Sequence, residues 1–67
     1  MINIYPFMGK RVIVTCLDGT VFDGKVFDIE DASEDEDEVE DSLVMDLPDG
    51  RILGLRASEI DRIEIAE

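Results

Sequence analysis

The dipeptide Asp18-Gly19 lies between two strand-like stretches and limits this chain to a few architectures. The first stretch, residues 10–17, alternates and is rich in β-branched side chains, and residues 20–29 supply the returning strand. Asp-Gly tolerates the positive φ angles of a two-residue hairpin turn. The sequence therefore predicts an antiparallel β-hairpin near the start of the domain.

The pattern inside these stretches predicts which side chains face a core and where the sheet bends. Val12, Val14 and Cys16 fall on one face of the first strand. Gly24 lies inside the second strand, where a glycine commonly marks a bulge or a sharp bend at which a sheet curls. We expect Cys16 to be a small buried apolar residue, because the chain has no His to act as the base for a nucleophile.

Three more strands are predicted, at residues 42–47, 51–57 and 60–66. Pro48-Asp49-Gly50 joins the first two as a tight turn, since Pro fixes φ and Gly supplies a left-handed position. Before the last strand, Ser58-Glu59 is expected to form one tight turn.

The segment before the first strand is apolar and contains one proline. Residues 2–9 form either a single helical turn or an extended lead-in. Tyr5, Phe7 and Met8 are expected to cap one end of the folded domain, with a contact to another subunit as the alternative.

Five short strands without a long helix predict one all-β domain over residues 1–67. An open meander would expose two edges and an apolar face, whereas a sheet rolled into a small barrel buries that face. We therefore expect a five-stranded SH3-like barrel. The competing oligonucleotide-binding barrel usually has a helix between its third and fourth strands, where this chain has only PDG.

The formal charge of −12 is concentrated in one segment. Nine of the 18 acidic residues lie within residues 30–41, while the rest of the chain holds nine acids against six bases. Packing like charges together costs free energy that water and salt relieve. Residues 30–42 are therefore predicted to form an acidic, flexible loop between the second and third strands.

The composition also argues against several classes of protein. No run approaches the roughly 20 apolar residues that span a bilayer, and no basic segment precedes an apolar run at the N-terminus. A single cysteine allows no internal disulfide, so we expect a cytoplasmic protein. No phosphate loop or catalytic triad is recognisable, and an EF-hand loop starting at Asp31 would need Gly where Glu36 stands. We expect no enzymatic activity, no cofactor and no dedicated metal site.

Two segments carry a resemblance to a known family. GKRVIVTCLDGTVFDGKVFDIED, residues 9–31, resembles the first Sm motif of Sm-like (LSm) proteins, through its opening Gly-Lys-Arg-Val, the Asp-Gly turn, Phe22-x-Gly24 and Asp28. LRASEIDRIEI, residues 55–65, resembles the second motif, with Arg56 at the position of the family's Arg. Glu59 stands where the family has Asn, and the acidic segment replaces the Asn that follows the second strand.

The resemblance implies a short N-terminal helix, a strongly bent five-stranded sheet and assembly into rings that bind RNA at the pore. It makes Asp28 and Arg56 the RNA-contact candidates. Nucleic-acid affinity depends heavily on Lys and Arg, and six bases spread through this acidic chain make no basic stripe.

Three functions follow as hypotheses. The first is a noncatalytic Sm-like interaction or scaffold module that forms a homo-oligomer. In this oligomer the fourth strand of one subunit pairs with the fifth strand of the next. Because assembly brings many acidic loops together, added salt should strengthen it. The second is an adaptor whose loop binds a basic protein partner. The loop residues of this hypothesis are Glu34, Asp35, Glu36, Asp37 and Glu38. The third is RNA binding that depends on Arg56.

Overall fold

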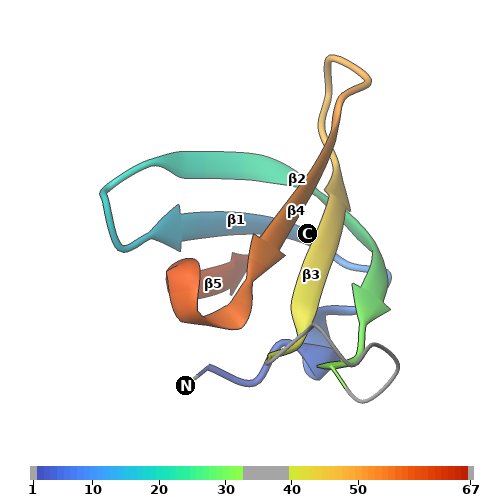
Figure 1. Cartoon of the computed structure of the whole chain (residues 1–67). Helices are drawn as coiled ribbons and strands as arrows, with labels where there is room; N and C mark the ends of the chain where they lie inside the picture. Colours follow the sequence, from blue (N-terminus) through green and yellow to red (C-terminus); the bar gives the residue numbers. More distant parts are fainter. Residues whose placement is uncertain (1, 33–39, 67) are drawn as a thin grey trace.

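The computed structural model describes residues 2–32 and 40–66 and has five antiparallel strands in one sheet (Figure 1). The strands are β1 (Arg11–Cys16), β2 (Val21–Glu30), β3 (Ser42–Asp46), β4 (Ile52–Arg56) and β5 (Ile60–Ile65), in the order β4-β3-β2-β1-β5. A 3-10 turn, η1 (Tyr5–Phe7), precedes β1, and another, η3 (Ala57–Glu59), links β4 to β5. The prediction of an all-β fold is confirmed, and each predicted strand boundary lies within one residue of the observed one.

The hairpin between β1 and β2 is present, but its turn is longer than the predicted two residues. The Cys16 amide donates to the Thr20 carbonyl at 2.8 Å, so three residues connect the paired positions. Only Gly19 has a positive φ, of 91°, while the Asp18 carboxylate accepts from the Thr20 amide at 2.9 Å. This hydrogen bond lowers the pKa of Asp18 and lets it keep an ordinary backbone conformation.

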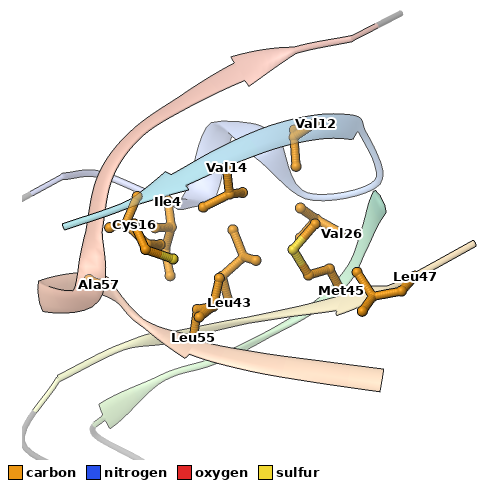
Figure 2. Close-up of a cluster of buried hydrophobic side chains, with 11 residues drawn as sticks. Ile4, Val12, Val14, Cys16, Val26, Leu43, Met45, Leu47, Leu55 and Ala57 are labelled. Atoms are coloured by element: carbon orange, nitrogen blue, oxygen red, sulfur yellow. The ribbon is translucent and has the colours of Figure 1, made fainter. Parts of the chain in front are cut away.

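The core fills the inner face of the curved sheet, the face that carries Val12 and Val14 (Figure 2). Both valines are fully buried and Cys16 is buried beside them, as their predicted common face requires. Opposing residues come from the other strands and from the N-terminal segment. The buried apolar set is Ile4, Val12, Val14, Cys16, Val26, Leu43, Met45, Leu47, Leu55, Ala57 and Ile60.

Gly24 allows β3 to cross close to β2, but it is not the site of the bulge. A Cβ at Gly24 would lie 2.6 Å from the Asp46 carbonyl oxygen, so only glycine fits there without a backbone shift. The register of β2 against β3 slips between Val26 and Asp28, which makes Phe27 the extra residue. The irregularity therefore follows the close approach by three residues along β2, a strand that is strongly curved (Figure 1).

The N-terminal segment closes the core mainly through a residue outside the predicted cap. Ile4 is only 1% exposed, and Phe7 packs against the core from a partly buried position. Tyr5 and Met8 are exposed. The Gly9 amide donates to the Val26 carbonyl, and the Val26 amide donates to the Lys10 carbonyl. These two hydrogen bonds hold the segment against β2. The choice between a helical turn and an extended lead-in is thus resolved in favour of a turn.

Candidate assembly surface

β4 and β5 are the two ends of the sheet. In the part of the chain that the structure describes, β4 pairs only with β3 and β5 only with β1. The outer side of each strand therefore presents backbone donors and acceptors that another strand can use. The sequence hypothesis had named these same two strands as the sites of self-association.

Some inner-face side chains of the two edge strands are less covered than the central residues they lie opposite. On β4, Leu53 lies opposite the fully buried Met45 but is itself only partly buried. On β5, Ile65 lies opposite the fully buried Val12 and is 53% exposed. Ile63, which lies opposite the buried Val14, is partly buried. Both edges thus carry apolar surface that this domain does not cover by itself.

A groove of about 510 Å³ opens beside β4. It lies between the turn that follows β1, the start of β2, β4 and η3. Its apolar lining comprises Cys16, Leu17, Phe22, Leu53 and Leu55, while Asp18, Thr20, Gly54, Ser58 and Glu59 complete it. No residue of β5 lines this groove, so the two edges differ in shape.

Cys16 lines the groove as a buried thiol. Burial raises its pKa, and the negative charges of Asp18 and Glu59 raise it further. A raised pKa disfavours the thiolate, which is the nucleophilic form of a cysteine. This agrees with the prediction of a small buried apolar residue at Cys16.

The C-terminal end of the acidic segment is fastened to η3. The Glu40 carboxylate accepts hydrogen bonds from the Ser58 amide at 2.7 Å and from the Ser58 hydroxyl at 3.0 Å. These bonds, with the charge of Arg56, lower the pKa of Glu40. The Ala57 amide also donates to the Asp41 carbonyl at 3.1 Å. One end of the acidic segment is thus tied to the turn between the two edge strands.

A second set of contacts ties both ends of that segment together. The Asp41 carboxylate accepts from the Ala32 amide at 2.9 Å. Local desolvation, the charges of Asp31 and Asp41, and hydrogen bonds to their carboxylates raise the pKa of Tyr5 to about 12. The N-terminal turn η1 and both ends of the acidic segment therefore meet at Tyr5.

The two RNA-contact candidates lie on the outer face of the sheet, on different strands. Asp28 is opposite Val44, and Arg56 is opposite Ser42, one row further along β3. The Asp28 carboxylate accepts from the Ile29 amide at 2.9 Å. Arg56 makes no ion pair within the described residues, although its charge acts on Glu40. The structure brings the candidates to one face without joining them.

Counting only ion pairs within residues 2–32 and 40–66, three of the six basic residues have carboxylate partners. Ion pairs join Arg11 to Asp23 at 3.1 Å, Arg51 to Asp49 at 2.6 Å and Arg62 to Glu64 at 3.2 Å. All six side chains are exposed, so each pair contributes little stability. The three paired arginines lie on β1, in the β3–β4 turn and on β5.

Sequence reasoning located some of this surface and missed the rest. It identified β4 and β5 as strands and Arg56 as a candidate. It did not anticipate the contact of Glu40 with Ser58, because no spacing rule joins residues 18 positions apart. The predicted loop residues Glu34 to Glu38 lie outside the described residues.

Within residues 2–32 and 40–66, no group of three or more His, Cys, Asp or Glu side chains is arranged to hold a metal ion. Over the same ranges, no helix has the length and apolar character needed to cross a membrane. No protein-family model, curated protein or solved structure matches the chain.

Proposed function

We propose that this protein is a cytoplasmic, noncatalytic Sm-like module that assembles with copies of itself by pairing β4 of one copy with β5 of the next, and that the assembly serves as a scaffold. The observation that carries the proposal is the position of β4 and β5 at the two ends of the sheet. Both strands keep partly exposed apolar side chains on the inner face, at Leu53 and Ile65. Strand addition would extend the sheet and cover these side chains.

Electrostatics sets the conditions for this assembly. Each copy brings a formal charge of −12, so neighbouring copies repel one another at low ionic strength. Salt at about 0.15 M shortens the range of this repulsion to roughly 8 Å, while burial of apolar surface is retained. Assembly should therefore become stronger as salt is added.

Light scattering after size exclusion, at low and at high salt, tests the proposal. We expect a mass several times the 7.5 kDa of one chain, and a larger share of it at high salt. A single-chain mass under both conditions, at high protein concentration, would rule self-assembly out.

A second function is favoured by the placement of charge. Half of the acidic residues lie in residues 30–41, so the acidic segment is suited to bind a basic protein surface. Replacing the carboxylates of Glu34 to Glu38 by amides should abolish capture of such a partner while the circular dichroism spectrum stays unchanged. If every partner is still captured, the segment acts only as a spacer.

RNA binding is the less favoured alternative, because three of the six basic side chains are paired with carboxylates in the part of the chain that the structure describes. It predicts a mobility shift with U-rich or A-rich oligonucleotides at low salt, and the loss of that shift in Arg56→Ala. Absence of any shift at low salt excludes it.

A further inference from the structure

We propose that the groove beside β4 binds a basic-apolar peptide, a short segment of a partner protein in which aliphatic side chains lie beside Lys or Arg. This inference rests on the second proposed function, the binding of a basic partner, and it adds a binding site on the folded domain. The groove volume of about 510 Å³ lies within the range of about 300–1,000 Å³ that is usual for ligand pockets. The groove therefore has room for the side chains of a peptide.

The lining of the groove offers apolar surface that the domain itself leaves uncovered. Phe22 and Leu53 pack against the core but are only partly buried. Leu17, also part of the lining, is 69% exposed. Contact with an aliphatic side chain would remove this surface from water, which is favourable because it is apolar. The lining therefore selects an occupant with apolar side chains.

Two carboxylates come together in the lining. The Leu17 amide donates to the Glu59 carbonyl at 3.0 Å, which joins the turn after β1 to η3. Asp18 follows Leu17 directly, so this hydrogen bond holds Asp18 and Glu59 on neighbouring parts of the groove. Burial, and then the charges of these two residues, raise the pKa of Cys16. Both negative charges therefore act on the apolar wall to which Cys16 belongs.

The acidic segment adds negative charge beside the groove. Ser58 is part of the lining, and its amide and hydroxyl donate to the Glu40 carboxylate at 2.7 and 3.0 Å. No Lys or Arg is among the described residues that line the groove. An anionic occupant would be repelled, and another copy of this chain carries the same formal charge of −12.

A basic-apolar peptide satisfies both properties of the groove. Its aliphatic side chains match the apolar lining, and its positive charges match Asp18, Glu59 and the nearby Glu40. A lysine is well suited to this position, because its hydrocarbon stem can lie on apolar surface while its ammonium group stays in water beside the carboxylates. Charge and apolar surface thus point to the same occupant.

A labelled peptide Lys-Leu-Lys-Leu-Lys with blocked ends is the probe. Lys-Ser-Lys-Ser-Lys keeps its charge, and Glu-Leu-Glu-Leu-Glu keeps its apolar side chains. Fluorescence anisotropy with dilute protein, in about 0.15 M salt that screens attraction beyond roughly 8 Å, compares the three. The probe should bind at least about tenfold more tightly than either matched peptide. Equal affinity of the Lys-Ser peptide, or of the Glu-Leu peptide, would overturn the inference.

One variant tests the apolar lining. Leu17→Ser removes an exposed leucine from the groove and should weaken probe binding about tenfold. Ile52→Ser is its matched control, because Ile52 is 68% exposed on the neighbouring strand β4 but does not line the groove. This control should bind the probe like wild type. Equal losses in the two variants would contradict the groove site.

A double variant tests the charges. Asp18→Asn with Glu59→Gln removes both carboxylates of the lining, and the amide oxygen of the new Asn can still accept from the Thr20 amide. Asp46→Asn with Glu64→Gln removes two exposed carboxylates outside the groove and gives the same net charge. The first pair should weaken probe binding about fivefold more than the second. The same loss in both would show that only net charge matters and would overturn the inference.

Amide chemical shifts in an NMR titration locate the probe. The amides of Leu17 and Thr20, in the turn between β1 and β2, should move as the probe is added. Shifts confined to residues 30–41 would overturn the groove site and would still support binding of a basic partner by the acidic segment. Absence of probe binding would also overturn the inference, whereas the adaptor function is judged separately by the capture experiment on Glu34 to Glu38.

Discussion

The centre of the sheet and its two edges are built from similar residues but are covered very differently. Leu43 and Met45 on β3 are fully buried, whereas Leu53, one strand further out, is only partly buried. Val12 on β1 is fully buried, and Ile65 beside it on β5 is half exposed. A domain this small has too few elements to cover its outer strands. The edge strands therefore contribute to the core through Leu55 and Ile60, and they keep exposed apolar surface at Leu53 and Ile65.

The largest expected effect separates the two regions with one kind of substitution. Leu43→Ala should destabilise the domain by about 2–5 kcal/mol, because it leaves a cavity at a fully buried position. Leu53→Ala should cost about 1 kcal/mol in the monomer, since its side chain is already partly exposed. Urea unfolding of dilute protein measures both. Equal losses would show that centre and edge do not differ in this way.

The next largest effect is expected when a glycine of a central strand is compared with a glycine of an edge strand. Gly24→Ala should cost about 1–3 kcal/mol, because the added Cβ meets the Asp46 carbonyl at 2.6 Å. Gly54→Ala on the edge strand should change the free energy of unfolding little, because a Cβ there meets nothing within 4 Å. Thermal melts of the two variants measure the difference, and a milder effect at Gly24 than at Gly54 would contradict the close approach.

A smaller effect concerns the contact that ties the acidic segment to η3. The hydrogen bonds from Ser58 lower the pKa of Glu40 in the folded protein. The contribution of Glu40 to folding stability is therefore present above its unfolded pKa, and it is lost as pH falls through the lower folded pKa. Glu40→Gln should therefore reduce stability at neutral pH, and its difference from wild type should shrink in acid. Glu30→Gln, at the exposed end of β2, is the charge-matched control. Unfolding curves across the acid range would show parallel behaviour of the two variants if the contact is absent.

The smallest effect lies in alkali and concerns the only tyrosine of the chain. The pKa of Tyr5 is raised from 10.0 to about 12 in the folded protein. The contribution of Tyr5 to folding stability is therefore complete below pH 10.0, and it is lost as pH rises toward 12. Tyrosinate absorbance should therefore titrate near 12 in the folded protein and near 10.0 in denaturant. Asp31→Asn should lower the folded midpoint, since the charge of Asp31 contributes to the shift. A folded midpoint of 10.0 would show that Tyr5 does not contact the carboxylates.

The predictions that succeeded rest on short-range patterns, and those that failed include one local turn and several contacts between distant residues. Strand limits followed from alternation and from turn residues, which act over a few positions, and the common face of Val12 and Val14 is a property of one strand. The predicted length of the hairpin turn was wrong, because the Asp18 carboxylate accepts a hydrogen bond from the Thr20 amide. Gly24 was predicted to mark a bulge or a sharp bend; the structure has the bulge at Phe27 and a close approach of β3 at Gly24.

The candidate surface was predictable only in part for the same reason. The sequence predicted both β4 and β5 as strands, but the incomplete cover of Ile65 depends on how far the neighbouring strands extend. Ile4 was not expected in the core, because the short apolar segment before the first strand has no clear periodic pattern.

By itself, the sequence determined the all-β class, the five strands and the concentration of charge in residues 30–41. These properties arise from local backbone preference and from composition. Only the tertiary structure decided which strands lie at the edges, that a groove opens beside β4, and that Glu40 is bound to Ser58. Each of these depends on contacts between residues distant in sequence, and their free energy is set by how the whole sheet curves and packs.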